Sequence, residues 1–336
     1  MREYSSELHD VAATATPDRP RSTLSIVVPC YNEAANILVL FDRLRSALEQ
    51  ESIEWELIAV DDHSRDDTFD ILASLSQRDQ RVRAVRLARN VGSHIAITCG
   101  LDHSQGACAV VMSADLQDPP ELIPSLLERW RAGDQVVWAV RAEYEGRDAV
   151  SGLFSRIYHK SMARILAGND LAPEGADVFL IDRVVVDALA QYHERNLSLF
   201  AILAWLGFQQ GRILYKKEAR QRGASGWTLR KKLKLFVDSI TAFSYFPIRV
   251  MSIVGICISL LGCFYALIVI ANYFSDVPSE GWTSLMVVVL VLGGFQMAML
   301  GILGEYLWRS LDEARRRPRY NIEKVSGRAK DHSIIR

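Results

Sequence analysis

An acidic and amide-rich run, from Ser113 to Glu121, directly follows the apolar stretch Ala107 to Met112. In α/β proteins ligands bind where buried strands end, so this run stands where a site is expected. A hard divalent cation takes oxygen ligands, and Asp115 and Gln117 would project to one side of an extended segment. The run predicts a site for a metal-bound diphosphate; an ordinary acidic turn ended by two prolines is the alternative.

A second polar motif follows the first apolar run of the chain, which ends at Pro29. There Tyr31, Asn32 and Glu33 open a predicted helix, and an aromatic face beside polar groups suits a nucleobase. The alternative role of this motif is helix capping by Asn32.

Two more motifs stand at the ends of further predicted strands. In the first, Asp61 or Asp62 could accept hydrogen bonds from ribose hydroxyls or a base N–H, while Ser64 shapes the turn. In the second, Arg89 and Asn90 precede a helix and could reach a phosphate or ribose. An ordinary Asp-rich turn is the competing explanation of the first.

The segment between Leu24 and Arg141 supplies the elements that position these motifs. Short apolar runs alternate there with helical periodicity, which predicts strand–helix units around a mainly parallel sheet. The expected strands are Leu24 to Val28, Trp55 to Val60, Arg83 to Leu87, Ala109 to Met112 and Gln135 to Val140. The first helix has an apolar stripe made of Ile37, Leu40, Phe41, Leu44 and Leu48. Beyond this segment we expect mostly helix over 151–167 and 183–208, then a strand from Ile213 to Tyr215.

Two uncharged apolar stretches, Val250 to Tyr273 and Ser284 to Leu303, are each about long enough to cross a hydrocarbon layer roughly 30 Å thick. Their connection lacks Lys and Arg while both outer flanks are basic, so both flanks should face the cytoplasm. Before them, Thr228 to Phe246 alternates basic with apolar residues, as in a helix lying in the headgroup layer. Two core helices of a soluble protein and a solvated charged face are the alternatives.

The composition restricts the classes of protein to which this chain can belong. Its 336 residues are 49% hydrophobic and 24% charged, as in a globular protein, and the net charge of −1 gives no basic field for nucleic acid. Five cysteines without C-x-x-C spacing argue against a disulfide framework and a structural zinc site, and favour a reducing compartment. The polar first twenty or so residues lack the apolar centre of a signal peptide, so we expect a loose arm.

Together, in this order and spacing, the motifs resemble the family-2 glycosyltransferases of GT-A fold, specifically the branch that moves a sugar from a nucleotide onto a polyisoprenyl phosphate. Dolichol-phosphate mannose synthases and bacterial polyprenyl-phosphate glucosyltransferases belong to it. The resemblance runs from about Ser22 to Arg317 and is most specific in ADLQDPPE and in GASGWTLRKKLKLFVDSITAFSYFPIR.

The resemblance implies an α/β, GT-A Rossmann-like domain with a mainly parallel sheet, followed by an amphipathic interfacial helix and two transmembrane helices. The chain then divides into a disordered arm (1–21), a cytoplasmic catalytic domain (22–226), a juxtamembrane amphipathic helix (227–248), two transmembrane helices (249–308) and a basic cytoplasmic tail (309–336). Such a protein would lie in the bacterial inner membrane with both termini in the cytoplasm.

The matching motifs also imply roles for individual residues. Asp115 and Gln117 would bind Mg²⁺ or Mn²⁺, Asp177 would sit at the reaction centre, and Arg141 and Arg156 would contact phosphates. The residues implied to bind the nucleotide are Pro29, Tyr31, Asn32, Glu33, Asp61, Asp62, Ser64, Arg89, Asn90 and Ala114. The residues implied to bind the lipid-phosphate acceptor are Lys216, Arg220, Arg222, Trp227 and Lys232.

Two positions depart from the pattern of this family. Ser113 stands where the first acid of the metal motif is usual, and Val178 and Phe179 stand where an arginine is expected. The first change removes a negative ligand from the metal site.

A phosphomonoester has a second pKa of about 6, so a lipid phosphate is largely ionised at neutral pH and needs positioning more than a strong base. Attack by this single nucleophile predicts inversion at the anomeric carbon. The resemblance therefore implies transfer of a hexose from a UDP- or GDP-linked sugar to undecaprenyl phosphate at the cytoplasmic face of the membrane, with the oligomeric state open. The alternatives are a transferase to another membrane acceptor, such as diacylglycerol or a glycan, and a non-catalytic nucleotide-binding relative.

Overall fold

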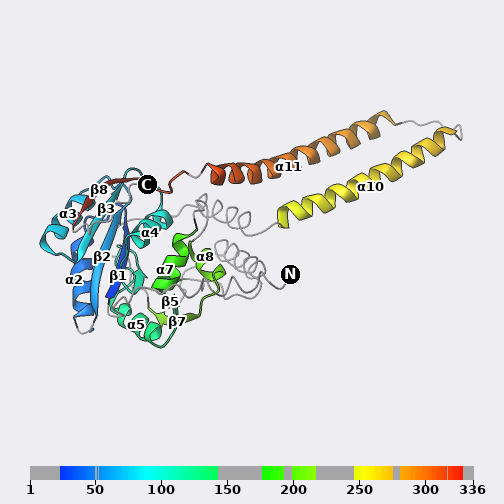
Figure 1. Cartoon of the computed structure of the whole chain (residues 1–336). Helices are drawn as coiled ribbons and strands as arrows, with labels where there is room; N and C mark the ends of the chain where they lie inside the picture. Colours follow the sequence, from blue (N-terminus) through cyan, green and yellow to red (C-terminus); the bar gives the residue numbers. More distant parts are fainter. Residues whose placement is uncertain are drawn as a thin grey trace, which may run out of the picture.

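The α/β part of the protein is built around one mixed sheet (Figure 1). This computed structural model describes residues 23–49, 51, 53–142, 176–192, 199–216, 246–274, 281–315 and 317–327. Within these residues, eight strands pair in the order β7-β5-β6-β4-β1-β2-β3-β8. The predicted α/β class with a mainly parallel sheet is confirmed.

The five strands predicted between Leu24 and Arg141 are present, with ends that shift by at most two residues. The strands are β1 (Thr23–Cys30), β2 (Glu54–Asp61), β3 (Val82–Leu87), β4 (Cys108–Val111), β5 (Val136–Arg141), β6 (Ala176–Asp182), β7 (Gln210–Tyr215) and β8 (Ile322–Ser326). Strand β7 extends the expected one toward the N-terminus. Strands β6 and β8 have no counterpart among the predicted strands.

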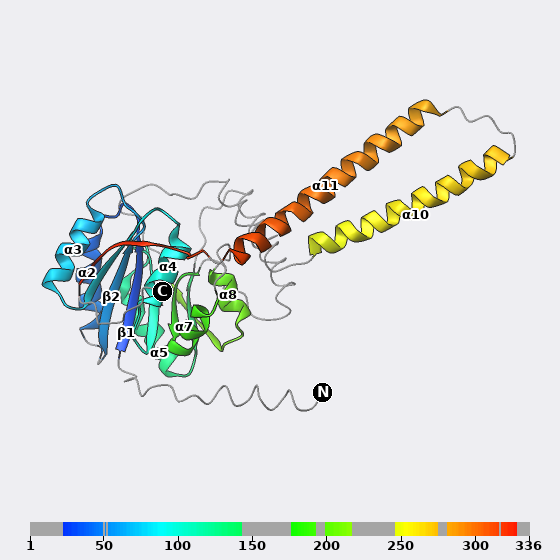
Figure 2. The ribbon, with the colours of Figure 1, turned by 45° about the horizontal axis from the view of Figure 1, so that its top comes forward.

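Helices cover both faces of the sheet, which explains why the strands are apolar almost throughout (Figure 2). One face packs against α2 (Ile37–Leu48), α3 (Thr68–Arg78) and α5 (Ile123–Arg131). The other packs against α4 (Ser93–Asp102), α7 (Arg183–Ala190) and α8 (Leu199–Trp205). The predicted apolar stripe of α2 is buried in full. The short 3-10 helix η2 (Pro120–Leu122) leads into α5, so the two prolines do begin a helical segment.

The topology gathers the polar motifs on one side of the sheet. Strands β1, β2 and β4 run parallel, so their carboxyl ends lie together. Strand β6 runs antiparallel to β4 and β5, with Phe179 opposite Val111 and Ala176 opposite Val140. Its amino end, which carries Asp177, therefore lies beside the carboxyl ends of β4 and β5. We call this side of the sheet the strand-end side.

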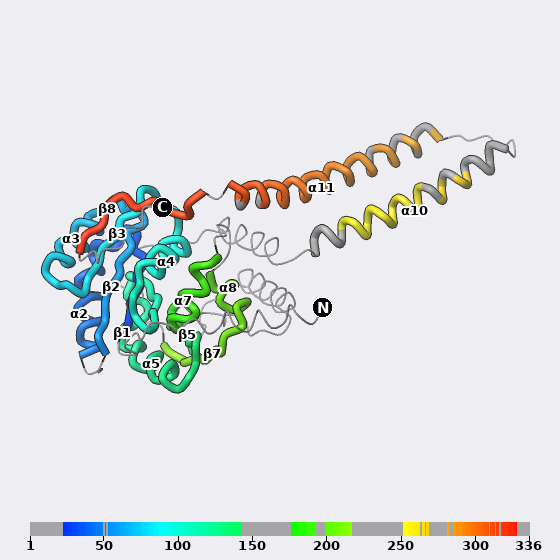
Figure 3. Tube along the Cα trace, viewed as in Figure 1, coloured from blue at the N-terminus to red at the C-terminus, as the bar shows by residue number. Residues whose placement is uncertain are grey.

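The last strand, β8, returns from the C-terminal part of the chain to the sheet and lies antiparallel to β3 (Figure 3). Leu87 pairs with Ile322, so the start of β8 also lies on the strand-end side. The predicted catalytic domain ends at residue 226, and this segment was expected in a basic tail. The structure adds it to the sheet.

Two long helices, α10 (Phe246–Phe274) and α11 (Trp282–Ala314), contact each other and extend away from the sheet (Figure 1). Among the described residues, the segment Val287–Asp312 is long and apolar enough to cross a membrane, and α10 contains a shorter apolar stretch, Met251–Gly262. The two helices coincide with the predicted spans; crossing of a bilayer stays a prediction. The arm over 1–21 and most of the predicted helix over 227–248 lie outside the described residues.

Candidate active site

The loop after β4 is bent, and this corrects the expectation of an extended segment. Leu116 has a φ of 59°, a left-handed conformation that breaks the alternation of side chains expected in a strand. The Oδ1 atom of Asp115 accepts hydrogen bonds from the Ser113 hydroxyl and, at 3.1 Å, from the N–H of Gln117. The carboxylate is therefore oriented by its own turn. A ligand role for Gln117 stays a prediction and no longer rests on strand geometry.

A buried polar pair lies next to this turn. The Tyr215 hydroxyl, at the end of β7, donates to Oδ1 of Asp118 at 2.5 Å, and the two residues are 5% and 1% exposed. Burial and the neighbouring Asp118 raise the pKa of Tyr215 well above its usual range, and Arg141 only partly opposes them. The phenol is thus a fixed donor that ties β7 to the loop after β4.

The structure brings Arg141 and Asp177 together. Arg141 ends β5 and Asp177 is the second residue of β6, and their side chains form an ion pair across the two strands. The side chains are 23% and 40% exposed, so the pair can meet a ligand from the strand-end side. Val178 and Phe179, which replace an expected arginine, are buried in the core of the sheet.

The loops after β1 and β2 are joined through Asn32. Its N–H donates to Ser64 Oγ at 2.9 Å, and its Oδ1 accepts from the Arg65 N–H at 2.9 Å. Helix capping by Asn32 is therefore wrong: α2 is preceded by Asn36, which makes no side-chain cap bond. Tyr31 is 43% exposed beside this junction, so its ring is accessible to a ligand.

The two carboxylates at the end of β2, Asp61 and Asp62, are buried and hold neighbouring loops. Asp61 accepts from the Ser64 N–H at 3.0 Å and from Arg86 at 2.9 Å. Asp62 accepts from the N–H groups of Val91 and Gly92 at 2.7 and 2.8 Å. Burial raises the pKa of Asp62, and these two bonds partly oppose the shift. Direct contact of either carboxylate with a nucleotide stays a prediction.

Glu33 accepts a hydrogen bond from the Asn36 side chain at 2.6 Å. The other remaining predicted site residues fall into three groups. Arg89, Asn90 and Lys216 are exposed, and Asn90 also donates to the Asp62 carbonyl at 3.1 Å. Pro29 lies within β1, and Ala114 is buried directly before Asp115. Five predicted residues lie outside the described part of the chain: Arg156, Arg220, Arg222, Trp227 and Lys232.

Among the described residues, no group of three or more His, Cys, Asp or Glu side chains is placed to hold a metal. Mg²⁺ bound together with substrate phosphates commonly takes only one or two protein carboxylates and keeps several waters. Asp115 with a diphosphate fits that pattern, whereas a site made by protein side chains alone does not.

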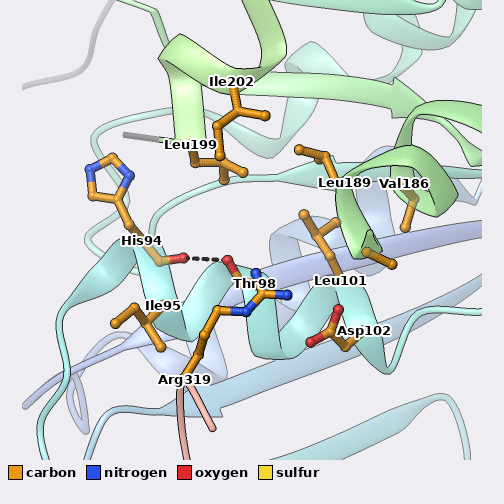
Figure 4. Close-up of a pocket in the computed structure, with 11 residues that line it drawn as sticks. His94, Ile95, Thr98, Leu101, Asp102, Val186, Leu189, Leu199, Ile202 and Arg319 are labelled. Atoms are coloured by element: carbon orange, nitrogen blue, oxygen red, sulfur yellow. Dashed lines mark hydrogen bonds between the residues drawn. The ribbon is translucent and has the colours of Figure 1, made fainter. Parts of the chain in front are cut away.

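A small cavity lies elsewhere, between α4, α7 and α8 (Figure 4). His94, Leu189, Leu199 and Arg319 are among the residues that line it, and its volume is about 30 Å³. This space is close to that of one water molecule and cannot take a nucleotide or a prenyl chain. None of the predicted site residues lines it.

Comparison with known proteins decides the family. Residues 25–189 match the model of Glycosyl transferase family 2. The chain is 38% identical over 307 residues to the uncharacterized glycosyltransferase YkcC of Bacillus subtilis, covering 90% of this chain and 94% of that protein. The chain belongs to glycosyltransferase family 2. The enzyme class predicted from the sequence is confirmed.

Other relatives of this family-2 glycosyltransferase have more specific names. It is 33% identical over 302 residues to the SfII prophage-derived bactoprenol glucosyl transferase of Shigella flexneri, covering 90% of this chain and 97% of that protein. Among solved structures, glucosyl-3-phosphoglycerate synthase of Mycobacterium tuberculosis superposes with a TM-score of 0.46 at 21% identity, over 66% of this chain and 80% of that chain.

Four residues that were not predicted as site residues make contacts around this site: Arg86 pairs with Asp61, Tyr215 with Asp118, and Glu323 with Arg86. Two of them, Arg86 and Tyr215, have a sequence feature that could have identified them. Arg86 is one of two arginines, with Arg83, among the buried apolar residues of β3, and a charged residue there needs a partner. Tyr215 ends a predicted strand, as the other site residues do. Asp118 could not be told from its acidic neighbours, and Glu323 lies in a segment that had no predicted structure.

Proposed function

We propose that this family-2 glycosyltransferase moves a hexose from a UDP- or GDP-linked sugar to a polyprenyl phosphate at the cytoplasmic face of the bacterial inner membrane. One observation carries the proposal. The oriented carboxylate of Asp115, which would bind a metal, and the Arg141–Asp177 ion pair, which would bind a phosphate, lie on the same side of the sheet. The relatives named bactoprenol glucosyl transferase, which match 90% of the chain, support the acceptor.

Asp115, with Gln117 as a further candidate, would hold Mg²⁺ or Mn²⁺ against the donor diphosphate. When bound, the ion supplies positive charge to the leaving group. Asp115 needs a defined direction for this role, and the hydrogen bonds from Ser113 and the Gln117 N–H provide it. Because Ser113 replaces an acid, the metal site would depend on the orientation of the Asp115 carboxylate.

The residues around Arg141 would position the acceptor. Asp177 holds the guanidinium of Arg141, so that this cation can neutralise a phosphate without swinging away. The acceptor oxygen attacks the anomeric carbon as the bond from that carbon to the diphosphate oxygen breaks. A single displacement inverts the configuration. The acceptor phosphate is already ionised at neutral pH, so no side chain has to remove a proton.

The membrane part of the proposal rests on helices α10 and α11 and on the basic residues before α10. Neutralising Lys231, Lys232 and Lys234 together should weaken use of the lipid acceptor more than nucleotide binding, because these cations would attract an anionic headgroup. An unchanged apparent affinity for the acceptor would refute that role.

The test uses the full chain in detergent or lipid vesicles with radiolabelled UDP- and GDP-sugars, undecaprenyl phosphate and Mg²⁺ or Mn²⁺. We expect one donor to give an organic-soluble labelled product, and Asp115→Asn to abolish it while membrane insertion is retained. Competition with diacylglycerol and glycan acceptors separates the lipid-phosphate acceptor from others. Nucleotide binding without any product would instead favour a non-catalytic relative.

A further inference from the structure

Arg86 connects three parts of the chain that are distant in sequence. Its Nη1 donates to Asp61 Oδ2 at 2.9 Å, its Nη2 to the Ser64 carbonyl at 3.1 Å, and its Nε to Glu323 Oε2 at 3.1 Å. The guanidinium is planar, so three bonds along its edges fix both its position and its plane. A single side chain on β3 thus holds the end of β2, the loop that follows, and β8.

The charges explain why this arrangement is needed. Asp61 is fully buried, and a buried carboxylate without a cation is strongly destabilising. Arg86 supplies the cation, with a side chain only 18% exposed and lying 5.6 Å from the centre of the Phe69 ring. Glu323 is 36% exposed and accepts from Nε of the guanidinium, and it also lies 3.4 Å from His63 Nδ1. Glu323 is therefore the outer anion that holds Arg86 in place.

The same network leads to the exposed tyrosine of the candidate nucleotide site. Ser64, whose carbonyl accepts from Arg86, also accepts the Asn32 N–H on its hydroxyl at 2.9 Å. Asn32 directly follows Tyr31, whose ring is 43% exposed. A continuous set of hydrogen bonds therefore joins Glu323 to the loop that carries Tyr31.

Glu323 belongs to β8, which follows α11 in the chain. Main-chain pairing with β3 fastens this strand, with Arg86 opposite Lys324. A second side-chain anchor is independent of Arg86: the Tyr320 hydroxyl donates to Asp102 Oδ2 at 2.8 Å. The segment that returns from α11 is thus attached to the catalytic domain by main-chain pairing and by several side-chain contacts, of which, among the described residues, that of Glu323 reaches the loop after β2.

We propose that Glu323 and Arg86 are positioning residues for nucleotide binding, so that the C-terminal strand β8 sets the shape of the loops after β1 and β2. The inference rests on the proposed function for the presence of a nucleotide there, and goes beyond it by giving the C-terminal segment a part in donor affinity. Loss of the Glu323 contact leaves Asp61 paired with Arg86, but the orientation of the Arg86 guanidinium is no longer fixed. Donor affinity should fall, while the chemical step remains.

The test compares the full-length wild type with Glu323→Gln, Glu323→Ala and Arg86→Lys. The controls are Tyr320→Phe and Ser326→Ala, which remove two other side-chain anchors of the segment, to Asp102 and to Ser76. Calorimetry with UDP and GDP gives Kd, and transfer assays give KM for the donor, KM for the acceptor and kcat. Arg86→Lys keeps a cation beside Asp61, so it remains informative where Arg86→Ala would unfold.

We expect the Glu323 variants to raise the nucleotide Kd and the donor KM about fivefold to tenfold, as for loss of one charge-assisted hydrogen bond. The acceptor KM and kcat should change less than about twofold, and both controls should behave as wild type. Normal nucleotide Kd in the Glu323 variants, or an equal loss in Tyr320→Phe, overturns the inference and leaves the proposed function intact. Failure of the wild type to bind either nucleotide overturns both.

Discussion

The Tyr215 hydroxyl and the Asp118 carboxylate form a buried hydrogen bond of 2.5 Å between the end of β7 and the loop after β4. The bond crosses from the strand at one edge of the sheet to the turn that carries Asp115. Strands β5 and β6 lie between β7 and β4 in the sheet. The contact therefore links the turn after β4 to a strand that does not pair with β4. The candidate metal ligand is thereby supported by a residue far away in the sequence.

Tyr215→Phe should lower both stability and turnover. The change leaves a buried carboxylate oxygen without its donor, which costs about 1–3 kcal/mol of unfolding free energy. Turnover should fall because the turn holding Asp115 loses a support. Thermal unfolding and transfer assays measure the two effects, with Tyr192→Phe, whose ring packs on Trp205, as the control. A Tyr215→Phe enzyme with wild-type unfolding and activity would contradict this role.

Ser113→Ala should raise the concentration of Mg²⁺ or Mn²⁺ needed for half-maximal activity. The hydroxyl of Ser113 orients Asp115, and losing about 1–2 kcal/mol of this orientation corresponds to roughly a 5- to 30-fold higher requirement. Ser113→Thr keeps a hydroxyl and should keep the wild-type requirement. Metal titrations of the transfer rate make the comparison, and identical curves for all three proteins would exclude an orienting role.

His94 should make the fold sensitive to acid. Burial lowers its pKa below the ordinary value of 6.5, and its ring packs edge-on against Phe200 at 5.5 Å. Among the described residues, its Nδ1 has no hydrogen-bond partner. The unfolded chain takes up a proton as the pH falls below about 6.5 while folded His94 stays neutral, so stability is full above that pH.

As the pH falls from about 6.5 toward the lowered pKa, His94 should remove up to about 1.4 kcal/mol of stability per pH unit. Thermal unfolding between pH 7.5 and 5.5 tests this, with His94→Leu as the comparison. The variant should lose less stability over that interval than the wild type. Parallel pH curves for the two proteins would show that His94 does not contribute.

Glu121→Gln should leave transfer activity nearly unchanged, although Glu121 ends the acidic run that predicts the site. Its carboxylate receives two hydrogen bonds from Arg43 of α2, at 3.0 and 2.7 Å, and this contact outweighs burial to lower the pKa of Glu121. Glu121 is 53% exposed, so the ion pair should contribute less than about 1 kcal/mol to stability. Activity and unfolding assays compare Glu121→Gln with Asp115→Asn. A large loss of activity in Glu121→Gln would place it in the metal site instead.

Much of the α/β domain follows from local pattern. Strands such as β1 are continuous apolar runs because helices cover both faces of the sheet, and α2 shows its buried stripe at helical spacing. The polar motifs follow these strands, so their location on one side of the sheet was predictable from chain direction alone. The pairing of Arg141 with Asp177 needed β6, whose short segment carries no helical or alternating signal.

Two features could not be predicted from local pattern. The turn at Asp115 bends because its own carboxylate bonds the Gln117 N–H and Leu116 adopts a left-handed backbone, which a leucine rarely does. Strand β8 has the sequence Ile-Glu-Lys-Val-Ser, which is too short and too charged to stand out as a strand. Its structure depends on pairing with β3 and on the contact between Glu323 and Arg86, and both partners lie far away in the sequence.

The central claim is that Asp115 holds a divalent ion against the diphosphate of a sugar nucleotide. Crystals of the full chain soaked with Mn²⁺ and either UDP or GDP test it most directly through the anomalous signal of manganese. The account predicts a manganese peak within bonding distance of the Asp115 carboxylate, with the diphosphate beside Arg141. A nucleotide and metal bound elsewhere, away from Asp115, would contradict it.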